Sequence, residues 1–215
     1  MTTEQAHADA ALQAREDLAF MRGIVSDGRP FARNTGGVYF WSGIIYGTQC
    51  LINLVDLMAG QVLPPIVLLL NGIVPTVLFV GVLVYALSKR KPETGPKGPV
   101  ARAIEMAFQG TGLANLALVV VFGVAAFQRQ DMSIWFFYPV TVLALQGAVW
   151  YGAGRLRRRS WMLVVAAGWL LASIVCGLNV ENLTAYLGAL CVTLYGLMAV
   201  PGYVLMQISK DGVTD

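Results

Sequence analysis

Six long apolar runs dominate the sequence, at about residues 38–58, 65–88, 102–127, 134–153, 161–178 and 183–206. Each is close to the roughly 20 residues that an α-helix needs to cross about 30 Å of hydrocarbon. Only 13% of the residues are charged and 57% are apolar, whereas soluble domains carry about 25% charged residues. The connections are too short to form a separate soluble domain. We therefore expect an all-α, polytopic membrane protein with six transmembrane helices.

The positive charges divide unevenly between the connections. Of the 15 lysines and arginines, all except Arg129 lie before the first run, between the second run and the first residue of the third, between the fourth and fifth, or after the sixth. Cytoplasmic connections of membrane proteins are enriched in Lys and Arg. This distribution predicts that both termini are cytoplasmic. It also explains the formal net charge of +3 without a role in nucleic-acid binding.

Residues 2–26 have the pattern of an amphipathic helix on the cytoplasmic side. Thr2 and Gln5 have the spacing of a capping box. Small and apolar residues then recur every three or four positions, at Ala11, Ala14, Leu18, Met21 and Val25. Two interpretations stay open. The helix lies on the bilayer or against the protein's own loops, or it forms a dimer seam or a docking helix for another protein.

The sequence Gly28-Arg29-Pro30 is expected to end this helix, and residues 33–37 are expected to form a short hinge. These features predict three parts. Residues 1–36 form a cytoplasmic amphipathic helix and hinge, residues 37–208 form the six-helix transmembrane domain, and residues 209–215 form a cytoplasmic tail.

The first apolar run carries a polar stripe. Its members are spaced by four, three, four and three residues, so they share one helical face: Ser42, Tyr46, Gln49, Asn53 and Asp56. Such a stripe must face other helices or a water-filled space. Tyr39 and Trp41 fit an interfacial aromatic belt. Gly43 and Gly47 form a GxxxG motif, for which packing within the chain is favoured over dimerisation.

Three amide side chains are expected near the middle of the membrane, at Gln49, Asn115 and Gln146. Buried amides need hydrogen-bond partners, so these residues either bond to neighbouring helices or line a polar cavity for a small solute or lipid headgroup. Such a cavity would open outward past Asn53, Asn71 and Asp56. We expect Asp56 to reach headgroups or water, and Glu105 to reach the inner interface and pair with Arg102.

The sequence predicts no catalytic, cofactor-binding or metal-binding residues. The single histidine, His7, precedes the first apolar run, so a histidine-containing site inside the membrane is excluded. The motifs CxxC, HExxH and GxSxG are absent. Cys50, Cys176 and Cys191 all fall inside apolar runs, where free cysteine behaves as a small apolar residue. An enzyme is therefore the less expected class.

From the third run onward, about half of the chain resembles a family of small, uncharacterised bacterial inner-membrane proteins. The shared features are Trp135, Tyr138-Pro139, Gly147-Ala148-Val149-Trp150, a basic turn from Arg155 to Arg159, Trp161, Tyr186-Leu187 and Ala199-Val200-Pro201-Gly202. The resemblance implies six helices, location in a bacterial cytoplasmic membrane and no established activity. It assigns no site residues.

Two function classes follow from these features. The first is a non-enzymatic accessory or regulatory membrane protein that binds partners or lipid through residues 2–26 and its basic loops. The second is a small-solute or lipid transporter or channel with an amide-lined interior. The bilayer is an expected partner in both, and no cofactor is expected. The sequence does not predict an oligomeric state.

Overall fold

The computed structural model describes residues 29–89 and 99–211, and helices joined by short turns are the only regular structure in these ranges. The elements are α2 (Arg29–Met58), α3 (Pro65–Ser88), α4 (Pro99–Arg129), α5 (Ser133–Arg157), α6 (Ser160–Leu178), α7 (Leu183–Thr193), the π-helical turn η1 (Leu194–Ala199) and α8 (Val200–Asp211). Six helical segments in these ranges are long and apolar enough to cross a membrane, the last one running through α7, η1 and α8. The predicted helix over residues 2–26 lies outside the described residues.

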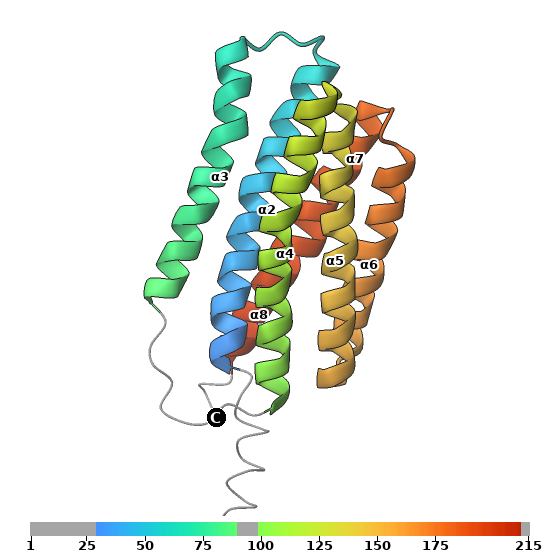
Figure 1. Ribbon diagram of the computed structural model, residues 1–215. Helices are drawn as coiled ribbons and strands as arrows, with labels where there is room; N and C mark the ends of the chain where they lie inside the picture. Colours follow the sequence, from blue (N-terminus) through green and yellow to red (C-terminus); the bar gives the residue numbers. More distant parts are fainter. Residues whose placement is uncertain (1–28, 90–98, 212–215) are drawn as a thin grey trace, which may run out of the picture.

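The helices form a bundle in which α2 contacts four other elements (Figure 1). Helix α2 packs against α3, α7, η1 and α8, and α5 packs between α4 and α6. Within the described ranges, α3 packs extensively on α2 alone. It lies at the edge of the bundle and leans away from it toward Ser88 (Figure 1). We call the end where α2 begins and α5 finishes the basic end, because it carries Arg155, Arg157 and Arg158.

Glycines allow the backbone of α2 to approach η1 and α8. A Cβ atom added to Gly36 would lie 2.8 Å from the carbonyl oxygen of Gly202 on α8. One added to Gly43 would lie 2.8 Å from the carbonyl oxygen of Leu194. A Cβ on Gly47 would meet the ring of Tyr195 at 2.9 Å. The GxxxG motif of the first apolar run is therefore used for packing within the chain, as favoured from the sequence.

The predicted hinge over residues 33–37 is wrong, because α2 is already helical from Arg29. Pro30 lies inside the described part of α2 and does not interrupt it between Arg29 and Met58. Gly36 suggested a flexible connection, but its missing side chain serves the contact with α8. The predicted domain boundary after residue 36 thus falls inside a continuous helix.

The last apolar run contains an irregularity that the sequence did not predict. Pro201 and Gly202 both lie inside α8, and the departure from α-helical geometry is the π turn at residues 194–199. A proline ring clashes with the carbonyl group four residues earlier, here that of Leu197. The wider π turn directly before Pro201 gives this carbonyl room, which explains its position.

Large aromatic side chains fill the centre of the bundle. Trp150, Trp169 and Tyr186 are each at most 2% exposed. A cavity of about 10 Å³ near the basic end is lined by residues that include Ile104, Trp150 and Met162. This volume is about that of one water molecule. The described side chains around Trp150 therefore leave room for about one water molecule at this point.

Candidate functional site

The polar stripe of α2 faces α3. Asn71 on α3 is buried, and its Nδ2 donates to Oδ1 of Asn53 over 2.8 Å and to the backbone oxygen of Gln49 over 3.2 Å. Pro75, one turn further along α3, is the other buried residue of that helix. A buried amide in hydrocarbon needs such partners. Asn71 therefore attaches α3 to α2 through two polar contacts.

Asp56 lies at the end of α2 but does not reach the surrounding medium as expected. It is 5% exposed, and its Oδ1 accepts a hydrogen bond of 2.8 Å from the backbone N–H of Leu63. Its backbone oxygen accepts from the N–H of Gln61 over 2.8 Å. The intervening turn has positive φ at Gly60 (87°) and Gln61 (60°). Asp56 thus holds the α2–α3 turn, which folds over its carboxylate.

The lower part of the stripe also makes contacts within the protein. Ser42 is 1% exposed, and its hydroxyl donates to the backbone oxygen of Val38 over 2.6 Å. The ring of Tyr46 lies 5.7 Å from that of Phe79 on α3. Helix α3 therefore covers the stripe from Tyr46 to Asp56, by aromatic packing at one end and hydrogen bonds at the other.

Gln146 of α5 pairs with a residue that sequence analysis assigned to the membrane interface. The hydroxyl of Tyr39 donates to Oε1 of Gln146. Tyr39 is only 6% exposed, while Trp41, the other expected belt residue, is 52% exposed. The interfacial assignment of Tyr39 is therefore wrong. A signal was available, because Tyr39 lies three residues before Ser42 and extends the spacing of the polar stripe.

Asn115 differs from the other amides. Its Oδ1 is buried and has no hydrogen-bond partner among the residues that the structure describes. Hydrogen bonds do not link it to Gln49 or Gln146 within the described ranges. The three amides expected at mid-membrane therefore lie in three separate settings. Gln146 bonds to Tyr39, and the backbone oxygen of Gln49 accepts from Asn71. Asn115 lies on α4 with a side-chain oxygen that has no described partner.

Other chemistry-bearing residues do not form a recognisable centre. Cys50, Cys176 and Cys191 are free thiols that lie inside the bundle, Cys50 being half-buried and the other two buried. Over residues 29–89 and 99–211, we find no group of three or more His, Cys, Asp or Glu side chains that could hold a metal ion. Among the described residues, the polar contacts of α2 with α3 and α5 instead involve the predicted residues Gln49, Asn53, Asn71 and Gln146.

Together these features define an all-helical, multi-pass membrane protein. Comparisons with known protein families, with curated proteins and with solved structures found no match to this chain. The resemblance to small bacterial inner-membrane proteins therefore stays a prediction.

Two asparagine-to-leucine substitutions should have different effects on stability. Asn71→Leu removes two hydrogen bonds that join α3 to α2, so we expect a loss of about 1–2 kcal/mol, near the upper range for membrane hydrogen bonds. Asn115→Leu removes a buried oxygen that has no partner in the described structure. Because an unsatisfied polar group is itself destabilising, this change should be neutral or slightly stabilising. Unfolding of the purified protein in mixed micelles measures both, and equal losses would contradict the assignment.

Proposed function

We propose that this chain is a non-enzymatic accessory or regulatory membrane protein that acts by binding, through residues 2–26 and its basic connections. The observation that carries the proposal is that polar groups of the α2 stripe form hydrogen bonds within the protein. Asn71 covers Asn53, and the Asp56 carboxylate accepts from the α2–α3 turn. A path for a polar solute needs polar groups that the solute can reach, and these groups already have protein partners.

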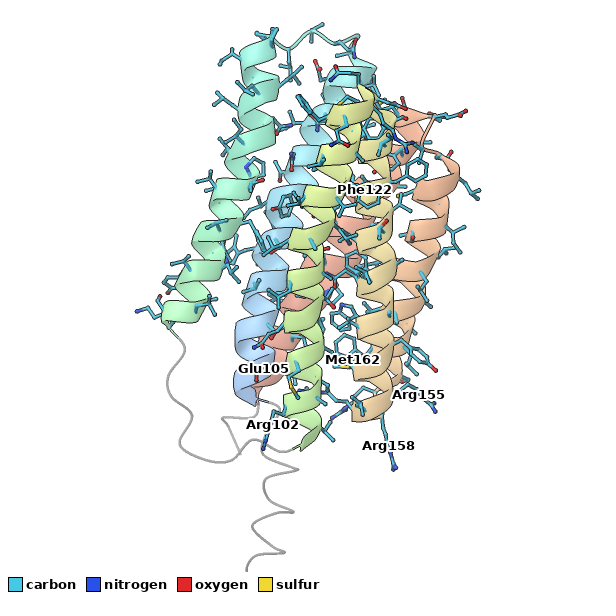
Figure 2. The ribbon with its side chains drawn as sticks, viewed as in Figure 1. Arg102, Glu105, Phe122, Arg155, Arg158 and Met162 are labelled. Atoms are coloured by element: carbon cyan, nitrogen blue, oxygen red, sulfur yellow. The ribbon has the colours of Figure 1, made fainter. Side chains whose placement is uncertain are left out.

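The packing of the core supports the same proposal. Trp150 and Trp169 are each 1% exposed, and Tyr186 is 2% exposed. Side chains of this size leave little room for a solute between α5, α6 and α7. Binding to a partner, in contrast, needs no interior path. It needs exposed surface and charge, which the arginines at the basic end provide (Figure 2).

We assign the basic end to the cytoplasm of a bacterial inner membrane, with both termini on that side. The support is the distribution of charge over the bundle. Arg102, Arg155 and Arg158 lie at the basic end, whereas Arg129 is the last residue of α4 at the opposite end. Labelling of single cysteines at positions 130 and 157 with an impermeant reagent on intact cells checks this, and modification at 157 alone would reverse the assignment.

A small-solute or lipid transporter is the second candidate. One observation favours it, which is the buried and unpaired Oδ1 of Asn115 on α4. Such an atom is the kind of group that a transient solute or water could satisfy. A transporter would bind its solute through the amides in the interior. Because α3 covers the polar stripe of α2, a second conformation in which α3 moves away from the stripe would be needed for transport.

A paired measurement separates the two candidates. The purified protein is reconstituted in sealed vesicles, and the efflux of small solutes and the transbilayer movement of a labelled phospholipid are recorded. For an accessory protein, both rates should equal those of protein-free vesicles. In parallel, a photocrosslinking residue at position 18 in cells should give a discrete adduct with a protein. An identical residue at position 164 on the exposed face of α6 serves as the control.

The outcomes are distinct. Solute efflux or lipid movement that rises with the amount of protein and is abolished by Gln49→Leu or Asp56→Asn would overturn the accessory function. Adducts of equal yield and size from positions 18 and 164 would show that the N-terminal segment has no specific partner, which also counts against it.

A further inference from the structure

One face of α4 changes from charged to apolar along its length. Its residues follow the helical spacing of three, four, three and four positions: Arg102, Glu105, Gln109, Gly112 and Leu116. Arg102, Gln109, Gly112 and Leu116 are exposed, and Glu105 is half-buried. Nε2 of Gln109 donates to Oε1 of Glu105 over 3.2 Å. Figure 2 shows Arg102 and Glu105 near the basic end, on the side of α4 nearer to α2.

The depth of these residues follows from the length of the helix. Helix α4 has 31 residues, so it is about 46 Å long and exceeds the hydrocarbon thickness by about 16 Å. If the excess is divided equally between the two ends, Arg102 lies in the headgroup region. Glu105 then lies at the hydrocarbon boundary, and Gln109 lies about 7 Å inside it. Gly112 and Leu116 are deeper still.

An exposed primary amide inside hydrocarbon requires a polar partner. The hydrogen bond to Glu105 uses one of the two N–H groups of Gln109 and leaves the other to donate to a second acceptor. Gly112 adds an open strip below it, because a Cβ built there would have no atom within 4 Å among the described residues. Polarity therefore falls with depth on this face as it does along a phospholipid molecule.

We propose that this face of α4 binds a phospholipid whose headgroup carries a primary ammonium, such as phosphatidylethanolamine, in the leaflet at the basic end. The guanidinium of Arg102 pairs with the phosphate, the Glu105 carboxylate accepts from the ammonium, and the amide of Gln109 donates to an ester carbonyl. One acyl chain lies over Gly112 and Leu116. The site goes beyond the proposed function and does not depend on it.

Charge complementarity selects this lipid over the alternatives. A carboxylate at the hydrocarbon boundary repels an anionic headgroup such as phosphatidylglycerol. A choline headgroup carries positive charge but has no N–H to donate. Arg102 and Glu105 can each keep a partner within the protein while they bind the lipid, because a guanidinium has five donors and a carboxylate has about four acceptor positions. A helix of another protein would not need the ordered sequence of charge, amide, glycine and leucine.

Thermal unfolding of the delipidated protein in mild detergent tests the site. Phosphatidylethanolamine, phosphatidylcholine and phosphatidylglycerol with identical acyl chains are compared, together with soluble phosphoethanolamine. We expect phosphatidylethanolamine at about 100 times its Kd to raise Tm by about 5 °C more than the other two lipids do. Soluble phosphoethanolamine should have little effect, because it lacks the acyl chains.

Variants of the face separate its parts. In Glu105→Gln, the preference for phosphatidylethanolamine over phosphatidylcholine should disappear. In Gln109→Leu, the shift should fall for every lipid. The matched controls at the opposite end, Glu181→Gln and Gln128→Leu, should keep the wild-type response. If Glu105→Gln does not fold, Arg102→Gln replaces it and should weaken binding of all phospholipids.

Several results would overturn the proposal. These are equal shifts by all three lipids, a larger shift with phosphatidylglycerol, a full shift with soluble phosphoethanolamine, or unchanged selectivity in Glu105→Gln. Efficient disulfide crosslinking of Gly112→Cys between two copies in native membranes would also overturn it, because a second protein chain would then cover the face.

Discussion

Replacing Gly43 by alanine is expected to destabilise the bundle by about 1–3 kcal/mol, the usual range for overpacking of a close contact. The added Cβ would lie 2.5 Å from the backbone nitrogen of Ala199 and 2.8 Å from the carbonyl oxygen of Leu194. Both are backbone atoms of η1 and its boundary with α8, so rotation of a side chain cannot relieve the clash. Helix α2 or the π turn has to move.

The control for this change lies on the same helix. At Gly37, the one described atom that an added Cβ would meet is Sδ of Met206 at 3.9 Å, an ordinary van der Waals contact. Gly37→Ala should therefore be neutral, or stabilising by up to about 1 kcal/mol through the higher helix propensity of alanine. Denaturation of the purified variants in mixed micelles gives both values. Equal stabilities of the two variants would show that the α2–η1 contact is looser than described.

This contact also illustrates what could be predicted from the sequence. Hydrophobic length and the positions of basic residues predicted the number of spans, and the run at 65–88 coincides with α3. These are local properties of single segments. The helical conformation of residues 33–37 and the π turn were not predicted, because both depend on how α2 meets the last span. Gly36 and Pro201 are strong local signals for breaks, yet tertiary packing keeps both inside helices.

Some of the polar contacts could also be predicted from local features of the sequence, whereas others could not. Asn53 and Asn71 belong to adjacent spans joined by a short turn, so their proximity follows from the hairpin. Tyr39 and Gln146 are separated by 107 positions, and no local pattern relates them. Helical spacing placed Gln49 on the correct face of α2, but it could not distinguish a side chain in contact with α3 from a backbone oxygen that accepts the bond. Such distinctions need the positions of neighbouring helices.

The largest effect is expected for Trp150, which lies at the centre of the aromatic core. Its ring lies 5.6 Å from that of Tyr39, 6.0 Å from Phe108 and 5.8 Å from Trp161, all with edge-to-face geometry. Such contacts stabilise packing beyond the area that they bury. The side chain therefore connects α2, α4, α5 and α6 at one point, next to the small cavity at the basic end.

Trp150→Ala should destabilise the protein by about 3 kcal/mol, the lower end of the range for removal of a buried tryptophan. The lower end applies because the surroundings are apolar in both folded and unfolded states in a membrane, so the cavity and the lost contacts dominate. Trp41→Ala is the matched control on a 52% exposed residue, and it should change the free energy of unfolding by less than about 1 kcal/mol. Denaturant titration in mixed micelles with circular dichroism detection compares the two. A loss for Trp41→Ala as large as that for Trp150→Ala would mean that the aromatic cluster is not the centre of stability, and that the exposed face of α2 is covered in the folded protein.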